Sequence, residues 1–434
     1  MHTAVPQASK ADDAGPAASS GAGNGHGDGN RNATATTDPG GVPFAALTPE
    51  ALRRERTSIK WTRYPDDVLP LFVAEMDYAI APEVQQAIIE RVRASDTGYL
   101  DGPGPLAPAF AGFARDRWGW EVDPAHVHLC TDVSVGIVET LRLALPDGGR
   151  VAITTPVYPS FFEMLEELPV EVVEIPLATD PTAGPRLDLD ALAEAFGSAA
   201  GIDALLLCNP HNPHGLLHSE ADLTELARLA SAHDVFVVSD EIHAPLTHRG
   251  RSFVPFAPIA ASAGVASVTV TSASKGWNLA GTKCAMVIAA SAEDDTLLRR
   301  LPPEVACRAS ILGLHANVAA FSRARDWLDE AIRRIEENVN LLKDLVASQL
   351  PGVRFVPPEA GYLAWLDFGA TRIADDPHAA ILREACVALG DGRTFGRGGR
   401  GHVRVNLACP PQTVRDAIAR IAPITHPDDA EETS

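Results

Sequence analysis

The chain has 434 residues, of which 46% are hydrophobic and 21% charged, with a formal charge of −21 at pH 7. This size and composition indicate a globular chain with one large and one smaller domain. The acidic balance argues against a nucleic-acid-binding surface. No run approaches ~18 consecutive apolar residues, so no transmembrane helix is expected.

The two ends of the chain are polar. Residues 1–43 carry almost no large apolar side chains, and residues 427–434 are acidic, so we expect a disordered N-terminal tail and a short acidic C-terminal tail. The N-terminus lacks the apolar core of a signal peptide. The six cysteines show no CxxC spacing, which argues against structural zinc or a disulfide framework. We therefore expect a cytoplasmic protein.

From about residue 120, short apolar runs alternate with helical patterns. Strands are predicted at 126–130, 150–155, 170–175, 204–208, 235–239, 267–272 and 284–289, and helices at 133–145, 158–168, 219–233 and within 314–350. Apolar strands separated by helices predict an α/β fold whose mainly parallel sheet lies between helices. Such sheets bind ligands at the carboxyl ends of their strands.

The pattern changes after residue 350. The runs VRFVPPEAGYLAWLDF and HVRVNLAC predict strands, with helices near 377–389 and 411–421, which indicates a smaller α+β domain. The predicted organisation is a joining segment at 44–110, a large domain at 111–315, a connecting helix at 316–349 and a small C-terminal domain at 350–426.

Lys275 and Asp240 are the most informative residues. Lys275 lies in TSASKGWNLAGTK (271–283), after a predicted strand, and Asp240 follows the strand-like start of VVSDEIH (237–243). A lysine in such a place can form a Schiff base with a carbonyl cofactor. A carboxylate at the end of a buried strand needs a partner, and a pyridinium N–H is suitable. Together they fit what pyridoxal phosphate (PLP) needs from its protein.

Each residue also has a plainer interpretation. Lys275, taken alone, is also consistent with a surface lysine in a serine-rich turn. Asp240 is consistent with a helix cap or, together with Glu241 and His243, with a metal site. No further ligands at a recognisable spacing support a metal.

Other residues near predicted strand ends could complete such a site. The hydroxyls of Ser272 and Ser274 suit a phosphate, and the strand–turn–helix run 130–145 offers free N–H groups at a helix start. Asn212, in the turn-rich run LLLCNPHNPHGLL, could place its amide on a ligand or form only an Asx-turn. Tyr158 could stack on a flat ring or belong to the core.

Arg404 lies in an otherwise apolar strand pattern. Its guanidinium should be paired there, either with a substrate carboxylate or with a structural acid. The run 396–401 formally matches GxGxxG, but it precedes a strand instead of opening a helix, so the dinucleotide interpretation is rejected.

These residues carry a family resemblance over roughly 50–425. The chain resembles the MalY/PatB-type cystathionine β-lyases, which are fold type I PLP enzymes of the aspartate aminotransferase superfamily. The resemblance rests on KWTRYPDDVLPLFVAEMDY (60–78), GYLDGPGPL (98–106), CNPHNPHG (208–215), VVSDEIHAPL (237–246), SASKGWNLAG (272–281) and RVNLACP (404–410).

The resemblance implies a role for each matching position. Lys275 looks like the Schiff-base lysine, Asp240 like the partner of the pyridine nitrogen and Arg404 like the arginine that holds the substrate carboxylate. Tyr99 looks like the tyrosine that reaches the cofactor phosphate of the neighbouring subunit, which implies a homodimer with shared sites. The other implied cofactor contacts are the phosphate contacts Val133, Ser134, Ser272, Ser274 and Lys283, and Asn212, Tyr158 and His243.

Three positions depart from the family pattern without removing a group that the mechanism needs. Trp277 stands where phenylalanine is common, Thr282 where leucine is frequent and Gly361 where threonine is common. They bear on side-chain specificity and not on the cofactor.

The resemblance implies a PLP-dependent carbon–sulfur β-lyase that cleaves L-cystathionine or another cysteine S-conjugate to thiol, pyruvate and ammonia. The alternative is an aminotransferase of the same fold, which would use the same lysine and aspartate. A third hypothesis, a non-catalytic PLP-binding regulator, conflicts with the acidic charge and with an N-terminal tail too polar for a helix-turn-helix.

Overall fold

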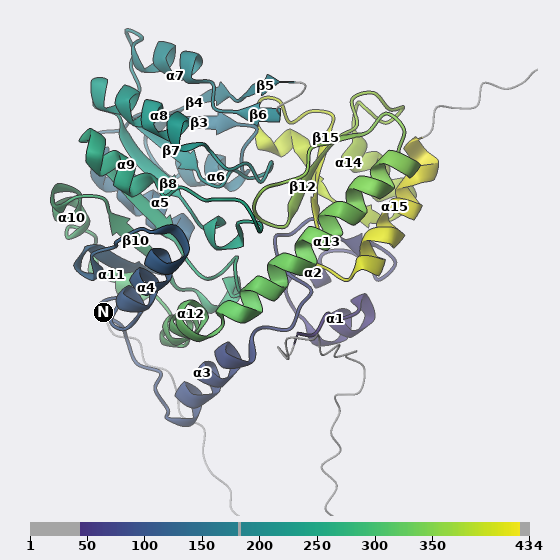
Figure 1. The fold of residues 1–434 in the computed structure, drawn as a ribbon, viewed down its shortest axis with the longest axis horizontal. Coiled ribbons are helices and arrows are strands. Elements are labelled where there is room, and N and C mark those ends of the chain that lie inside the picture. The colour runs from purple at the N-terminus through teal and green to yellow at the C-terminus, as the bar shows by residue number, and fades with distance from the viewer. Residues whose placement is uncertain (1–43, 181–183, 426–434) are drawn as a thin grey trace, which may run out of the picture.

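The computed structural model describes residues 44–180 and 184–425, so the predicted tails at 1–43 and 427–434 lie outside the described residues. Two sheets of unequal size form the framework, and the long helix α13 (Arg325–Gln349) runs diagonally across the view in Figure 1 towards the C-terminal helix α15 (Pro411–Thr425).

The large sheet has seven strands in the order β2-β10-β9-β8-β7-β3-β4. All are parallel to their neighbours except β10, which runs antiparallel to both β2 and β9. Their bounds are β2 (Val127–Cys130), β3 (Gly149–Thr155), β4 (Val170–Pro176), β7 (Ala204–Cys208), β8 (Phe236–Asp240), β9 (Ser267–Thr271) and β10 (Ala285–Ala289). The mainly parallel α/β sheet predicted from the sequence is confirmed.

Helices cover both faces of this sheet. Side chains alternate along a strand, so Leu206 of β7 packs with α5 and α6, while Leu205 and Leu207 pack with α7, α8 and α9. Burial on both faces explains why the strands read as continuous apolar runs. The helix bounds are α5 (Val133–Ala144), α6 (Ser160–Glu166), α7 (Leu189–Phe196), α8 (Glu220–Ala232), α9 (Phe256–Ala263), α10 (Ala292–Leu298) and α11 (Pro303–Cys307).

The small sheet is antiparallel and has the order β11-β12-β15-β14. Its strands are β11 (Arg354–Phe355), β12 (Leu363–Asp367), β14 (Gly390–Asp391) and β15 (His402–Asn406). The central pair β12 and β15 places Trp365 opposite Arg404. The helices α13 and α15 pack against each other beside this sheet, and their apolar faces belong to one core cluster.

The first described residues link the two sheets. Strand β1 (Leu69–Pro70) pairs with β13 (Val387–Ala388), whereas α3 (Pro82–Arg93) and α4 (Leu106–Trp118) pack on α12 (Ile311–Arg323). Two short helices, α1 (Pro49–Glu55) and α2 (Ile59–Thr62), precede β1. Strands β5 (Ala178–Asp180) and β6 (Gly184–Arg186) pair antiparallel in a separate two-stranded sheet.

Two predicted helices differ from the structure. The helix expected over 316–349 is divided at Ala324 into α12 and α13, because Nε1 of the buried Trp277 donates a hydrogen bond of 2.8 Å to the Ala324 carbonyl within the helical ladder. The helix expected near 377–389 ends at Ala385. Cys386 adopts a left-handed conformation (φ 51°), after which β13 pairs with β1, a distant partner that local periodicity does not reveal.

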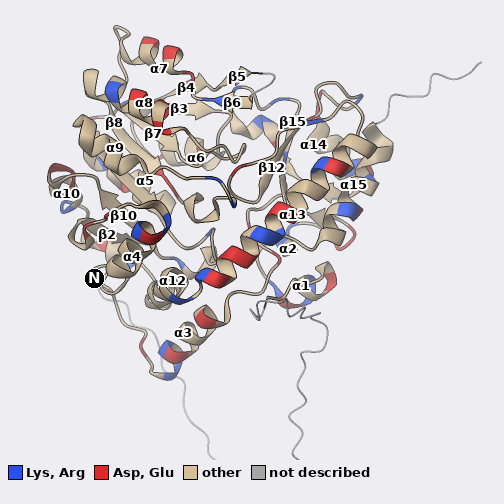
Figure 2. Ribbon diagram, viewed as in Figure 1, with Lys and Arg blue, Asp and Glu red and all other residues tan. Residues whose placement is uncertain are grey.

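Charge is spread over the outer helices. Figure 2 shows basic and acidic residues side by side along α13, and Glu330 of this helix pairs with Arg333 and Arg334. In the part of the chain that the structure describes, no helix combines the length and the apolar character needed to span a membrane.

Candidate active site

A cavity of about 190 Å³ opens at the carboxyl ends of the parallel strands. Asp240 is the last residue of β8, Cys208 is the last residue of β7, and Val133 begins α5; all three line the cavity. The topology therefore brings together residues that lie more than a hundred positions apart, at the edge where such sheets bind ligands.

Lys275 reaches this cavity from the turn after β9. Its side chain is half-buried, and Nζ donates a hydrogen bond of 3.1 Å to the backbone carbonyl of Ala74. Burial, followed by the positive charge of Arg404, lowers the pKa of Lys275 to about 8, while Asp240 acts in the opposite direction. About one-tenth of such an amine is neutral at pH 7, far more than for a solvated lysine. The residue is thus suited to act as a nucleophile or a base.

Asp240 is buried at the end of β8. Its Oδ1 accepts one hydrogen bond of 3.1 Å, from the backbone N–H of Ile242. Burial raises the pKa of Asp240 to about 7, against the lowering effects of that N–H and of Lys275. A carboxyl in this setting gains from a protonated ring nitrogen as partner, because such a partner stabilises its charged form.

The start of α5 forms the anion-binding end of the cavity. Asp132 caps the helix, since its Oδ1 accepts from the Val135 N–H at 3.0 Å, while its Oδ2 pairs with Nζ of Lys283 at 2.9 Å. Val133 and Ser134 of the first turn line the cavity, as do Ser274 and Lys283. First-turn N–H groups beside a lysine are a suitable site for a phosphate.

Arg404 is buried and contacts Asn212. Its Nη1 donates to Oδ1 of Asn212 at 3.2 Å and its Nη2 to the Phe72 carbonyl at 3.1 Å. The guanidinium lies 5.2 Å from the centroid of the Phe395 ring, and its buried Nε has no partner among the described residues. The Asn212 and Phe72 oxygens that accept from Arg404 are both neutral. The structural acid that was one interpretation of Arg404 is not found in the described part of the chain.

Tyr158 and His243 complete the walls. Tyr158 is half-buried and lies close enough to Arg404 to raise the pKa of that guanidinium, against the larger lowering effect of burial. His243 is buried, and its ring centroid lies 6.3 Å from that of Tyr362. Burial, then Lys275 and Arg404, lowers the pKa of His243 to about 3, so the imidazole is neutral at physiological pH. Next to it, Glu241 faces protein partners: Oε1 accepts from Ser239 Oγ and the Phe256 N–H, each at 2.9 Å.

Three predicted site residues, Ser272, Tyr99 and Arg404, do not line the cavity; Arg404 contacts its wall through Asn212. Ser272 is buried and its Oγ donates to the Cys284 carbonyl at 2.7 Å, while it accepts from the Ser274 N–H at 3.1 Å. Ser272 therefore supports the turn that carries Lys275. Tyr99 is 92% exposed and does not line the cavity.

The sequence analysis missed several contributors. The Ala74 carbonyl, which accepts from Lys275, belongs to the run LPLFVAEMDY that supported the resemblance, yet nothing in its side chain marked a role. Tyr362 also donates to this carbonyl, at 3.1 Å. Asp132 carried the one recognisable signal, since an aspartate before an apolar helix pattern is a typical N-cap.

The side chains present fit PLP. A lysine of lowered pKa, a buried carboxyl, a helix start beside a second lysine, and a tyrosine and an asparagine face one cavity. These are the groups that would hold the cofactor's carbonyl carbon, ring nitrogen, phosphate and ring. The guanidinium of Arg404, which is hydrogen-bonded only to neutral oxygens, supplies a cation for a carboxylate.

Comparison with known proteins gives the family. Residues 66–421 match the family Aminotransferase class I and II, and the chain belongs to this family. A Mycobacterium leprae relative, provisionally named cystathionine beta-lyase, is 42% identical over 399 residues, which cover 87% of this chain and 97% of that protein. The cystathionine beta-lyase of Corynebacterium glutamicum is 34% identical over 377 residues, 86% of this chain and 98% of that protein.

Solved structures agree with this assignment. The PLP-bound C-S lyase from Staphylococcus hominis superposes with a TM-score of 0.79 at 25% identity, and the match covers 85% of this chain and 96% of that one. The resemblance stated from the sequence, and the fold that it implied, are confirmed.

Proposed function

We propose that the chain is a PLP-dependent carbon–sulfur β-lyase that cleaves L-cystathionine or a related cysteine S-conjugate to a thiol, pyruvate and ammonia. The observation that carries the proposal is the meeting of Lys275 and Asp240 at one cavity, beside an arginine without a carboxylate partner among the described residues. The names of the Corynebacterium relative and of the Staphylococcus neighbour support the same reaction.

The residues that would hold the cofactor follow from their places in the site. Lys275 would carry it covalently, and Asp240 would pair with its ring nitrogen. The phosphate would be held by the first-turn N–H groups of Val133 and Ser134, with Ser274 and Lys283, over the support of Ser272. The ring would lie among Asn212, Tyr158 and His243. When bound, PLP withdraws electrons from the substrate's Cα.

The chain's own groups then perform the proton transfer. The Lys275 amine, once the substrate's own amine has taken its place, would remove the proton from Cα as a positioned general base; in the cofactor-free chain its pKa is already lowered to about 8. Arg404 would bind the substrate carboxylate through its guanidinium and so fix which bond at Cα faces the cofactor ring. The Cβ–S bond breaks with its electron pair on sulfur, and the thiolate takes up a proton. The remaining three-carbon enamine takes up water to give pyruvate and ammonia.

We also propose that the protein forms a homodimer in which each active site uses residues of both protomers. We further propose that it is located in the cytoplasm. Tyr99 is 92% exposed, and Ile89 and Val92 on the neighbouring helix α3 are 41% and 56% exposed. The exposure of these three large apolar side chains within residues 89–99 supports a surface that another protomer covers. In that arrangement Tyr99 would reach the phosphate of the other protomer's cofactor. All six cysteines are unpaired, which suits a reducing compartment.

The deciding experiment is anaerobic incubation of purified, PLP-loaded protein with L-cystathionine and no keto acid. Thiol and pyruvate are followed together, with the Lys275→Ala variant as control. Equal amounts of thiol and pyruvate over many turnovers support the lyase. Strict dependence on an added keto acid would replace it by the aminotransferase. Turnover of neither this substrate nor a panel of cysteine S-conjugates would overturn the proposal.

A further inference from the structure

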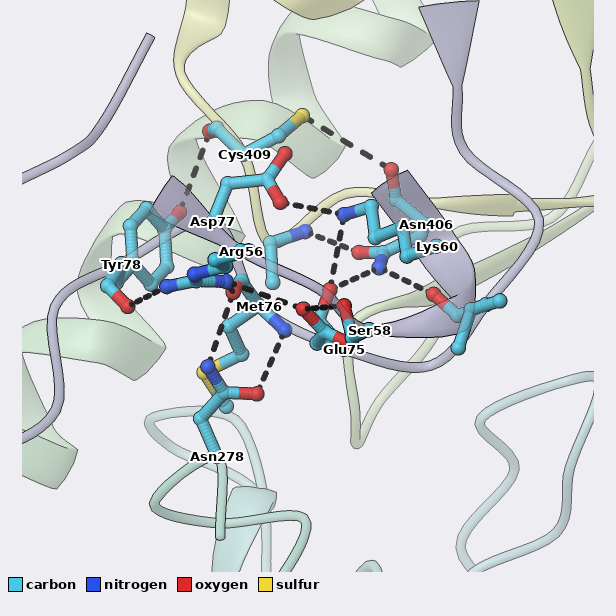
Figure 3. Close-up of polar contacts among 12 residues, drawn as sticks. Arg56, Ser58, Lys60, Glu75, Met76, Asp77, Tyr78, Asn278, Asn406 and Cys409 are labelled. Carbon is cyan, nitrogen blue, oxygen red and sulfur yellow. Dashed lines mark hydrogen bonds and ion pairs between the residues drawn. The ribbon is translucent and has the colours of Figure 1, made fainter. Parts of the chain in front are cut away.

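A buried asparagine contacts residues on either side of Ala74 and uses every hydrogen-bonding group of its side chain. Asn406, the last residue of β15, is 1% exposed. Its Nδ2 donates to the carbonyls of Val73 and Glu75, both at 2.7 Å, and its Oδ1 accepts from the Ala408 N–H at 2.7 Å. Figure 3 shows this side chain among the polar contacts of residues 75–78.

Asn406 binds the carbonyls of the residues on either side of Ala74. The Glu75 N–H donates to the Val73 carbonyl at 2.9 Å, which closes a three-residue turn centred on Ala74. Because Asn406 holds the carbonyls on either side, the Ala74 carbonyl is the one left to face the cavity. It accepts there from Nζ of Lys275 and from the hydroxyl of Tyr362, each at 3.1 Å.

Further contacts fix the same segment to the rest of the molecule. Nζ of Lys60 donates to the Glu75 carbonyl at 3.0 Å and pairs with Oδ1 of Asp77 at 2.6 Å, and both side chains are buried. The amide of Asn278, three residues after Lys275, accepts from the Met76 N–H at 2.9 Å and donates to its carbonyl at 3.0 Å (Figure 3). The turn at Ala74 is therefore held from both the small sheet and the lysine loop.

We propose that Asn406 is a positioning residue for Lys275: by binding the carbonyls of Val73 and Glu75, it turns the Ala74 carbonyl towards the Lys275 amine and so orients that amine in the cavity. An amine that donates one N–H to a fixed acceptor loses rotational freedom about its last bond, and its remaining N–H groups and lone pair take defined directions. The catalytic meaning of this orientation rests on the proposed function, but the contact itself does not.

The test measures the Lys275 amine directly, in the full-length chain freed of cofactor. Lysines are labelled briefly with acetic anhydride between pH 6 and 10, and the labelling of Lys275 is quantified by peptide mass spectrometry relative to exposed Lys343. A carbonyl acceptor favours the charged form of an amine, so Asn406→Ala should raise labelling of Lys275 at pH 7 about fivefold. Tyr362→Phe should lower it about twofold, because it removes the competing donor to the same carbonyl.

Asn338 provides a matched control. It is also 1% exposed, and its Nδ2 donates to two carbonyls of the adjoining loop, Leu407 at 2.8 Å and Cys409 at 2.7 Å. Asn338→Ala should lower the unfolding temperature by a similar amount and leave the labelling of Lys275 unchanged. An unchanged profile in Asn406→Ala, or equal shifts in the two asparagine variants, would overturn the proposal.

Tyr362→Phe keeps the test decisive if Asn406→Ala does not fold, since an unaltered profile in that variant contradicts a shared acceptor at Ala74. No step of the labelling needs substrate or cofactor. If the labelling of Lys275 changes as expected but the protein has no lyase activity, the proposed function is wrong and this inference stands. If the protein is an active lyase but the labelling does not change, this inference is wrong and the proposed function stands. In the loaded enzyme, Asn406→Ala should lower kcat with little change in KM.

Discussion

Nη1 of Arg404 lies 3.2 Å from Oδ1 of Asn212, although 192 positions separate the two residues in the chain. The contact joins the small sheet to the strand-end loop of the large one, at the wall of the cavity. It leaves the guanidinium bound only to neutral oxygens, with Nε free of any partner among the described residues. A buried cation in this state gains more from an incoming carboxylate than a paired arginine would.

Replacement of Arg404 by lysine should therefore reduce kcat/KM for L-cystathionine about 100-fold, because an ammonium cannot form the two parallel bonds of the fork. Steady-state kinetics measures the loss. The dissociation constant for PLP is the control and should stay within about twofold, since Arg404 is assigned to the substrate and not to the cofactor. A large loss of cofactor affinity with an unchanged KM would contradict the assignment.

Lys275→Ala should abolish turnover and leave PLP bound at most non-covalently. The reason is that Lys275 is assigned both the covalent link and the proton transfer, and loss of a nucleophile and base costs about 10³-fold or more. Borohydride treatment followed by peptide mass spectrometry measures the link. Cofactor fixed to another lysine in this variant, such as Lys283, would show that the assignment is wrong.

Glu241→Gln should stabilise the cofactor-free protein more at pH 8.5 than at pH 5.5. Burial raises the pKa of Glu241 from an ordinary 4.5 to about 8 in the folded chain. The stability that its protonated form contributes is complete below the unfolded pKa and is lost as the pH rises through the folded one. The variant lacks this loss, so the difference between the two proteins should grow with pH, on the order of a few kcal/mol.

Thermal unfolding of both proteins across this pH range measures the difference. Glutamine keeps an oxygen for Ser239 and for the Phe256 N–H, so the comparison isolates the charge. The neighbouring Asp240 titrates in both proteins and largely cancels. A constant difference in unfolding temperature from pH 5.5 to 8.5 would refute the raised pKa.

A mixture of inactive variants tests the shared site. In a homodimer whose sites combine Lys275 of one protomer with Tyr99 of the other, a Lys275→Ala/Tyr99→Ala heterodimer contains one intact site and one doubly defective site. Random exchange of equal amounts should restore about 25% of wild-type activity. Each variant exchanged with itself is the control. Recovery no greater than the sum of the parents would mean that each protomer builds its site alone.

The sequence predicted those parts of the fold that local pattern determines. The predicted ends of all seven strands of the large sheet lie within one residue of the observed ends. Burial on both faces requires a continuous apolar run in each of these strands, and such a run is visible in the sequence. The break at Ala324 was not predictable in this way, since it depends on Trp277, which is 47 positions away. The same holds for β13, whose partner β1 lies in a different part of the chain.

For the site, residue type was the informative signal. Lys275, Asp240 and Arg404 stood out because charged groups in apolar runs need partners. The Ala74 carbonyl could not stand out, because backbone groups are present at every position and only tertiary structure selects one. Ser272 shows the converse, since its hydroxyl suggested a phosphate ligand but is engaged with the Cys284 carbonyl.

The carboxylate of Asp132 caps α5 with one oxygen and binds Lys283 with the other. Lys283 itself has a left-handed backbone (φ 53°), and its carbonyl accepts from the Ser310 N–H at 2.9 Å, so both ends of the residue are tethered. A flexible lysine that had to be ordered by an arriving phosphate would cost the complex rotamer entropy. In this protein the Lys283 side chain is already ordered by its contact with Asp132 in the folded chain, so the anion-binding site at the start of α5 is preorganised before a ligand binds.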